Sequence, residues 1–198
     1  MKKVALFIMG TLLLAGCTFV GTSENIGRFE GNDKTIDVNA SFFLIHPKPG
    51  YKKSFVLENR VENKGSAKAA SDVFFKKFHK KFGSLTRSDE NMTIEEGLRT
   101  AKARGDKYLI TMDIDEWNSE FYMHCRAVTQ RSGSTTAKTD SIDVSVQVYD
   151  VRTGNLLNKQ RLQNSGCPVV FLNIIPVGTM GPKGRFDASL DKWFKNIQ

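Results

Sequence analysis

The chain has 198 residues, of which 40% are hydrophobic and 14 are Phe, which is sufficient for one buried core. Its 29 Lys and Arg outweigh its 21 Asp and Glu, so the formal net charge is +8. Acidic and basic residues are mixed along the chain. A net positive charge near a membrane can aid contact with anionic lipid headgroups or glycans, and it does not by itself argue for nucleic acid.

The N-terminus has the composition of a secretory signal peptide. Lys2 and Lys3 precede an apolar run from Val4 to Ala15. That run is shorter than the ~20 residues that a permanent membrane-spanning helix needs. A charged start, a short apolar segment and small residues at the end are typical of a signal peptide that is removed.

The run ends in Leu14-Ala15-Gly16-Cys17, which resembles the lipobox of bacterial lipoproteins at every position. The resemblance implies a diacylglycerol on the Cys17 thiol, cleavage before Cys17 and acylation of the new amino group. This covalent lipid is the only non-protein group that we expect. Thr18, rather than Asp, follows the cysteine, and by resemblance to enterobacterial sorting this implies the periplasmic face of the outer membrane. The alternative is an ordinary secretory signal with a chance cysteine.

The expected organisation is therefore a signal peptide over residues 1–16, a lipidated Cys17 with a flexible tether over 17–37, and a single periplasmic α/β domain over 38–198. The tether is polar, rich in Gly and without periodicity. Removal of residues 1–16 takes away Lys2 and Lys3, so the net charge falls to +6.

The first half of the domain reads as a strand near residues 39–46 and a helix over 65–83. We expect Ser66 to be the N-cap of this helix and Gly83 to follow its C-terminus. A core stripe of Ala70, Phe74, Phe78 and Phe82 repeats every four residues. Basic residues occupy the other faces, namely Lys76, Lys77, Lys80 and Lys81. We interpret the segment as a core-docked helix with a solvated basic surface, and a helix lying on a membrane is the alternative.

The second half continues with a strand at 83–89 and a helix that Thr93 and Glu96 begin as a capping box. Ile94, Leu98 and Ala101 form its expected buried stripe, and Gly105 ends it. Alternating residues then predict a strand from 107 to 117 and another from 141 to 150. A polar hairpin region separates these two strands, and a return strand, a Gly-rich turn at 178–184 and a terminal helix follow. The order predicts an α/β fold, a mixed sheet with an antiparallel meander covered by two or three helices.

Two cysteines remain besides the anchor, Cys125 and Cys167. They form a disulfide in an oxidising compartment or stay as two separate buried thiols. A metal site of His124, Cys125 and Cys167 is disfavoured, because adjacent residues on a strand point to opposite faces, so we expect no metal.

Asp113, Asp115 and Glu116 form the one acidic cluster. Two carboxylates on one face of a strand can bind Ca²⁺ or perform acid–base chemistry. The alternation of the strand also explains them as its solvent-facing side, and this is the interpretation that we favour.

The segment from Val73 to Cys167 resembles a Gram-negative lipoprotein family of unknown function. The shared features are "FFKKF", "TAKARGDKYLI", the pair Glu116-Trp117 and "VQVYDVRTGNLL". The pattern A-x-x-x-G-x-x-Y-L-I also looks like the N-terminal domain of the Tol-Pal propeller protein and the curli-secretion and penicillin-binding-protein-activator lipoproteins. These resemblances imply a small α/β domain that binds envelope proteins, and they supply no catalytic residues. Trp117, Phe121 and Tyr122 are the candidate partner-binding residues.

Two functions follow. The first is a non-catalytic outer-membrane lipoprotein that docks on an envelope protein through its α/β domain. The alternative is a periplasmic hydrolase or glycan-binding module that acts on cell-wall material, with Asp113, Asp115 and Glu116 as its acids. The oligomeric state stays open.

Overall fold

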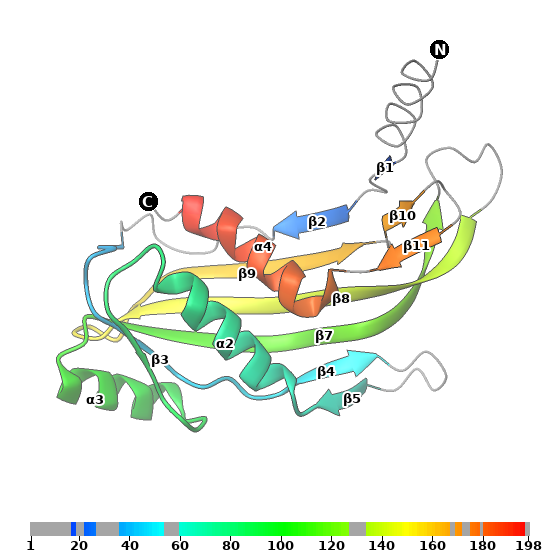
Figure 1. The fold of residues 1–198 in the computed structure, drawn as a ribbon. Coiled ribbons are helices and arrows are strands. Elements are labelled where there is room, and N and C mark those ends of the chain that lie inside the picture. Colours follow the sequence, from blue (N-terminus) through cyan, green and yellow to red (C-terminus); the bar gives the residue numbers. More distant parts are fainter. Residues whose placement is uncertain are drawn as a thin grey trace, which may run out of the picture.

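A computed structural model gives the fold of the chain (Figure 1). It describes residues 17–18, 22–26, 36–53, 60–126, 134–166, 169–171, 175–178 and 180–196. Of these, only the backbone is described for 17–18, 22–26, 53, 120–126, 134–139, 166, 169–171, 175–178 and 196.

The main sheet is built around one long strand, β7 (Tyr108–Arg126). The chain then turns back twice, so that β7, β8 (Ser134–Asp150) and β9 (Leu156–Gly166) form an antiparallel meander. On the other side of β7, the short β3 (Phe42–Leu44) runs parallel to both β7 and β6 (Leu85–Arg87). The sheet is therefore mixed, as the sequence predicts, and the predicted meander is confirmed.

Two further strand pairs extend this sheet. Beyond the end of β3, β4 (Gly50–Lys53) lies beside β7 and pairs with β5 (Arg60–Asn63). At the opposite edge β2 (Thr22–Ile26) pairs with β9. A separate small sheet joins β1 (Cys17–Thr18), β10 (Val169–Phe171) and β11 (Ile175–Gly178).

Helices cover both faces of the sheet. Figure 1 shows α2 (Ser66–Phe78) and α4 (Gly181–Asn196) side by side across the meander, and α3 (Ile94–Arg104) beside β3. The α2 and α4 side buries the larger core, whereas α3 packs on Phe43, Ile45 and Leu109 of the opposite face. None of the described helices combines the length and apolar composition of a membrane span.

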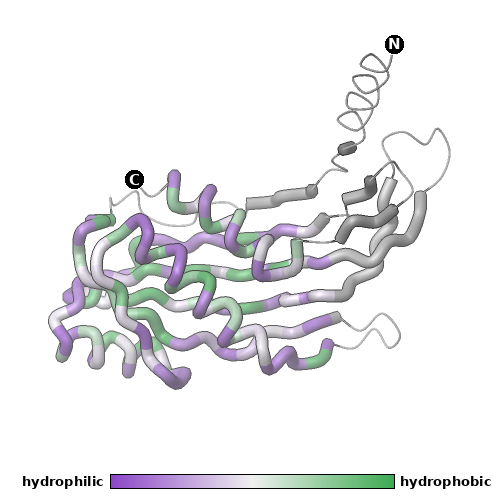
Figure 2. Tube along the Cα trace, in the orientation of Figure 1, coloured by the Kyte–Doolittle hydropathy of each residue, from purple (hydrophilic) through white to green (hydrophobic). Residues whose placement is uncertain are grey.

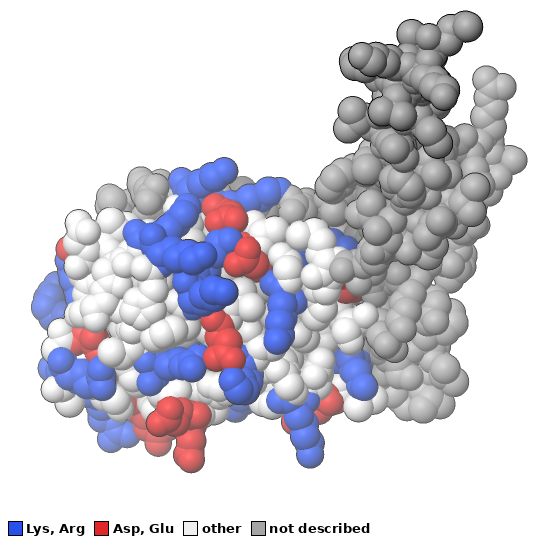
Figure 3. All heavy atoms as spheres, in the orientation of Figure 1, with Lys and Arg blue, Asp and Glu red and all other residues white. Residues whose placement is uncertain are grey.

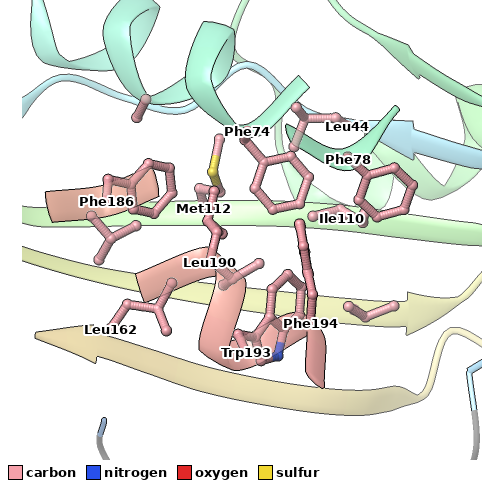
Figure 4. Packing of buried hydrophobic residues seen from close by; sticks show 14 of the residues in the cluster. Leu44, Phe74, Phe78, Ile110, Met112, Leu162, Phe186, Leu190, Trp193 and Phe194 are labelled. Atoms are coloured by element: carbon pink, nitrogen blue, oxygen red, sulfur yellow. The ribbon is translucent and has the colours of Figure 1, made fainter. Parts of the chain in front are cut away.

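The larger core is rich in aromatic rings from α2 and α4 (Figure 4). Phe194 lies 4.8 Å from Phe82, 5.9 Å from Phe78 and 6.1 Å from Phe74, measured between ring centroids. All three approaches are edge-to-face, the geometry that aromatic quadrupoles favour. Figure 2 shows the hydrophobic parts of β7 and β8 lying under these helices. The predicted core stripe of α2 is confirmed.

The start of α2 differs from its prediction. Gly65 is the N-cap, and Ser66 is the first helical residue and fully buried. The Ser66 hydroxyl donates to the Asn63 carbonyl at 2.7 Å and accepts from the Gly50 amide at 2.7 Å. Ser66 thus joins the helix to β4 and β5 instead of capping it. The helix also ends at Phe78, five residues before Gly83.

A buried ion pair holds the start of α4. Arg185 Nε donates to Asp140 Oδ1 at 2.7 Å, and Arg185 Nη1 donates to Asn164 Oδ1 at 3.0 Å. Both charged side chains are at most 2% exposed. Any other position of α4 that separated the pair would leave an unpaired charge in the core, so the pair favours this position of the helix.

The predicted turn at 178–184 is partly wrong, because α4 already begins at Gly181. Pro182 suits the first helical turn, where its missing amide hydrogen has no acceptor to lose.

The α3 layer confirms the capping box and corrects the buried stripe. The Thr93 side chain accepts from the Glu96 amide, and Gly105 closes the helix at φ +78°. Ile94 is 37% exposed, so it is not part of the stripe. Gly97 is buried in its place. The contact with Ile45 requires a glycine, because a Cβ there would lie 2.4 Å from Ile45 Cδ1.

Only part of the N-terminal prediction can be compared with the structure. The signal peptide at 1–16 lies outside the described residues. Within the expected tether, Cys17–Thr18 forms a strand that pairs with β10. Thr22–Ile26 forms a strand because the outer edge of β9 offers backbone groups that β2 pairs. Ile36 is already buried in the core, and the Asp37 amide donates to the Tyr108 hydroxyl. The packed domain therefore begins before residue 38.

Truncation of the ring at the centre of the aromatic cluster tests the packing of α4. Phe194→Ala should lower the free energy of unfolding by about 3–5 kcal/mol, because it removes a fully buried ring and leaves a cavity. Lys195→Ala, at the adjacent exposed position, should change it by less than about 0.5 kcal/mol. Urea denaturation measures both, and equal effects would contradict this packing.

Acidification tests the α3 capping box. Hydrogen bonds from the Thr93 amide and hydroxyl hold the pKa of Glu96 below its ordinary value. The stabilisation is therefore fully present above the unfolded-state pKa and is lost as the pH falls through the folded-state pKa, roughly between pH 5 and 3. The melting temperature of Glu96→Gln should be lower than that of the unchanged chain at pH 7, and the difference should shrink over this window. A constant difference would contradict the assignment.

Candidate functional site

Beyond the reach of α3, the second face of the meander is polar. Along β8, Asp143, Ser145 and Gln147 alternate with buried Val144 and Val146. The register places them beside Asp113 on β7 and Lys159, Arg161 and Gln163 on β9. The described residues place no helix over this part of the sheet, so its side chains form an open surface.

A hollow of about 570 Å³ lies on this surface, where β4 and β5 meet the meander. Its lining is mostly polar and charged: Lys48, Pro49, Tyr51, Glu62, Asp113, Ile114, Asp115, Ser145, Gln147 and Lys159. A second hollow of about 200 Å³ adjoins it toward the N-terminus of α3, since Lys48 and Asp113 line both. We call the two together the sheet groove.

A chain of hydrogen bonds positions Asp113 in the sheet groove. The Tyr149 hydroxyl donates to Gln147 Oε1, and Gln147 Nε2 donates to Asp113 Oδ2 at 3.1 Å. Burial raises the pKa of Tyr149, and the carboxylates of Asp113 and Glu95 add to this effect. The phenol therefore stays protonated as a donor at neutral pH, and Gln147 and Asp113 are held in one arrangement.

A second set of contacts orders the surface of β8 and β9 next to the sheet groove. Arg161 donates two hydrogen bonds to Asp143, Nε to Oδ1 at 2.8 Å and Nη2 to Oδ2 at 2.5 Å. The bidentate contact raises the pKa of Arg161. Gln163 also donates to Asp143, and Arg161 lies 3.8 Å from Asp115.

The predicted acidic cluster divides into two parts. Asp113 and Asp115 line the sheet groove, so the prediction that they share a face is confirmed. A bulge between Ile114 and Glu116 breaks the register, and Glu116 instead contacts Asn118 and Ser141. Among the residues that the structure describes, no group of three His, Cys, Asp or Glu side chains is arranged to hold a metal ion.

The partner-binding prediction for Trp117 is wrong. Trp117 is only 3% exposed and packs on Phe186 of α4, with 5.7 Å between ring centroids. The helix that covers it lies about 70 residues further along the chain, so the strand pattern alone gave no sign of this contact. Phe121 and Tyr122 belong to β7, but their side chains lie outside the described residues, and their role stays a prediction.

The cysteine predictions also fall outside the described side chains. The backbone of Cys17 begins β1 and that of Cys125 lies in β7, whereas Cys167 and the side chains of all three are not described. His124, the third residue of the disfavoured metal site, is described by its backbone alone. Lipidation at Cys17 and the bond between Cys125 and Cys167 stay predictions.

The predicted basic surface is confirmed for three lysines and wrong for one. Lys76, Lys80 and Lys81 are exposed. The side chain of Lys77 is only 15% exposed, and its ammonium group bonds Asp187 at 2.7 Å and Asp191 at 2.8 Å. Lys77 therefore joins α2 to α4. This contact could not be predicted without knowing where α4 packs.

Tyr51 is the main groove residue that the sequence did not reveal. Its side chain is 44% exposed, and Arg60 lies over its ring at 5.3 Å from the centroid. The segment "PKPGYKK" reads as a turn, because Pro, Gly and Lys are rare in strands. A strand forms there because Gly50 allows close approach to β7, where a Cβ would lie 2.3 Å from Ile114 Cγ2.

The fold is that of a small α/β domain found in other solved structures. PelC, a dodecamer from Paraburkholderia phytofirmans, is similar with a TM-score of 0.57 and 9% identity, covering 88% of this chain and 97% of PelC. A point variant of the same dodecamer, in another crystal form, gives a TM-score of 0.53 and 8% identity, with coverage of 90% and 98%. These identities support a likeness of fold alone.

The C-terminal domain of LpoB from Salmonella enterica is 12% identical, and the match covers 64% of this chain and 84% of that domain. Its TM-score of 0.40 does not establish a common fold. Among curated proteins, no sequence matches this chain.

Residues 51–194 match the family described as a domain of unknown function, DUF4823. The match spans most of the chain, which therefore belongs to this family. It confirms the predicted membership of a family of unknown function, whereas the likeness to the Tol-Pal and curli-secretion proteins stays a prediction.

The close approach at Gly50 supplies a test of the sheet groove. Gly50→Ala should destabilise the fold by about 1–3 kcal/mol, because the added Cβ meets the Ile114 backbone oxygen at 2.6 Å as well as its side chain. Gly65→Ala is the matched control, since the nearest atom there is 3.7 Å away and φ is −82°. That control should lose less than about 1 kcal/mol in thermal denaturation, because Gly65 is the N-cap of α2, where Ala is less favoured than Gly. Equal loss of stability in both variants would contradict the contact.

Proposed function

We propose that this chain is a non-catalytic lipoprotein, anchored in the outer membrane through Cys17, whose periplasmic domain docks on an envelope protein through the sheet groove. The observation that carries the docking proposal is the groove itself, an ordered polar surface with one large exposed aromatic ring at its edge. Tyr is enriched among the residues that dominate protein interfaces, because its ring buries much area and its hydroxyl still bonds.

The order of the groove supports binding rather than a merely solvated face. Asp113 and Gln147 line the groove and form one hydrogen-bonded series with Tyr149, and Asp143, Arg161 and Gln163 form another on the adjoining surface of β8 and β9. Side chains that neighbours already hold lose little further conformational freedom when a partner binds, so less of the binding free energy is lost.

The setting of the carboxylates favours docking over hydrolysis. A general acid in a hydrolase is kept away from water so that it retains its proton. Asp115 is 60% exposed in its side chain and Asp113 is also exposed. The second candidate, a glycan-binding module, has one observation in its favour, because a ring beside carboxylate, amide and ammonium groups suits sugar hydroxyls and the apolar face of a sugar.

The anchor proposal depends on Leu14-Ala15-Gly16-Cys17 and on the short apolar run before it. One acyl chain holds a protein at a membrane only marginally, and the additional chains of a lipoprotein make the attachment stable. PelC, which shares the fold, is a dodecamer. The experiment therefore has to distinguish a second copy of this chain from a different envelope protein.

In-cell crosslinking of the tagged, lipidated chain tests the docking proposal. We expect one defined envelope protein to be captured, and Tyr51→Ala to reduce its yield by about tenfold or more, as for an interface residue that carries over ~1.4 kcal/mol. Met180→Ala is the matched control, since Met180 is 54% exposed and lies immediately before α4, outside the lining of the groove. Cys17→Ser, run in parallel, reports whether capture needs the anchor.

Each alternative has its own outcome. Capture that Tyr51→Ala leaves unchanged would remove the groove from the proposal. Recovery of cell-wall fragments in place of protein, with binding to isolated cell walls lost in Asp113→Asn, would favour the glycan-binding candidate. A Cys17→Ser chain that is still processed and membrane-bound would overturn the anchor.

A further inference from the structure

The excess positive charge of the protein is concentrated on one face. Residues 66–81, which include α2, carry a formal net charge of +4, and residues 181–196, which form α4, carry +2. Together they equal the +6 of the whole chain without residues 1–16. The remaining segments of that chain therefore sum to zero. Arg185 of α4 is buried with Asp140 of β8, so the exposed positive charge comes from the lysines of the two adjacent helices.

The acidic residues of these helices are already neutralised by specific cations. Asp72 accepts from Lys68 and Arg87, both at 2.6 Å, whereas Asp187 and Asp191 share Lys77. In the part of the chain that the structure describes, no carboxylate pairs with Lys76, Lys80 or Lys81 on α2 and its C-terminal turn, or with Lys183 and Lys195 on α4. Figure 3 shows this surface, with many Lys and Arg side chains spread over it and fewer acidic side chains among them. We call these five lysines the lysine face.

The chemistry of the lysine face suits a broad anionic surface rather than a single bound ion. A lysine ammonium is a mobile point charge, whereas the planar fork of arginine recognises one phosphate or carboxylate with two bonds. The one exposed arginine beside α2, Arg87, is engaged by Asp72 and lies over the Phe75 ring.

Among the described residues, no large apolar side chain of α2 or α4 is exposed, and Met180, immediately before α4, is the one beside them that is, at 54%. Phe74, Phe78 and Phe82 are 0%, 2% and 9% exposed, because they form the core with α4. An interfacial helix that inserts needs such residues on its outer side. Attachment through the lysine face is therefore electrostatic, and salt should release it.

We propose that the lysine face rests on the anionic headgroups of a phospholipid bilayer. The charge of the face complements such a surface, and the lipobox pattern at Cys17 would hold the domain within reach of one. The proposal extends the proposed function, since it assigns a second surface, remote from the sheet groove, to lipid. An acidic protein is the competing partner, and the test separates the two.

Vesicle flotation of an unlipidated chain tests this directly. A chain that starts at position 17 with Cys17→Ser keeps every other residue that the structure describes, and it has no acyl chain to bind vesicles. We expect it to float with vesicles that contain roughly one third phosphatidylglycerol and not with pure phosphatidylcholine. Binding should disappear as the salt concentration rises from about 0.05 to about 0.5 M.

A charge-matched pair of variants locates the binding surface. We expect vesicle binding to weaken by about 100-fold in a triple variant that carries Lys76→Gln, Lys80→Gln and Lys81→Gln. Each lysine near an anionic surface contributes about fivefold. Lys52→Gln, Arg99→Gln and Lys102→Gln remove the same charge from exposed positions on β4 and α3, and this variant should bind as the parent does.

Equal losses in the two triple variants would overturn the proposal, because net charge rather than the lysine face would then cause binding. Failure of the parent to float, or flotation that salt does not reverse, would also overturn it. If the vesicles are not bound and Lys80 instead crosslinks to a protein in cells, the partner is an acidic protein. None of these results depends on the anchor or on Tyr51, so they are distinct from failure of the docking proposal.

Discussion

The packing of α4 against α2 decides which face of the sheet is closed to water. Rings from both helices meet edge to face, Lys77 joins α2 to two carboxylates of α4, and Arg185 reaches through to Asp140 on β8. With both helices on one side, the meander buries its valines there and leaves a polar second face that α3 covers only near Phe43 and Leu109. The groove stays open because α2 and α4 both pack on the opposite face of the sheet.

The two sides of the domain consequently differ in electrostatics. On the groove side acids and bases alternate and are bound by neighbours on adjacent strands, so the surface is polar without a strong field. On the helical side three acids are each held by a cation and further lysines remain, so the surface is positive. Such a division lets one small domain contact two chemically different neighbours at once, one through shape and hydrogen bonds and one through long-range attraction.

Local patterns in the sequence predicted much of this fold because they reflect local physics. The alternation along β8 placed Val144, Val146 and Val148 in the core, and Thr93 with Glu96 marked the start of α3. Errors arose where a distant segment intervenes: α4 covers Trp117, Asp187 and Asp191 capture Lys77, and Ile45 fills the space at Gly97. Of the candidate site, Asp113 and Asp115 were anticipated, whereas Tyr51 was not, since its strand forms only by pairing with β7 and β5.

The place of α4 in the chain has a consequence for biogenesis. Lys77 is bonded to residues that follow it by 110 and 114 positions, so the aromatic core closes only after the segment beyond β11 has been made. A chain synthesised through β9 alone leaves Phe74 and Phe78 without the α4 rings that pack on them. Contacts so distant in sequence form late and slowly. The core side of α2 therefore stays open to water until the last helix has been made.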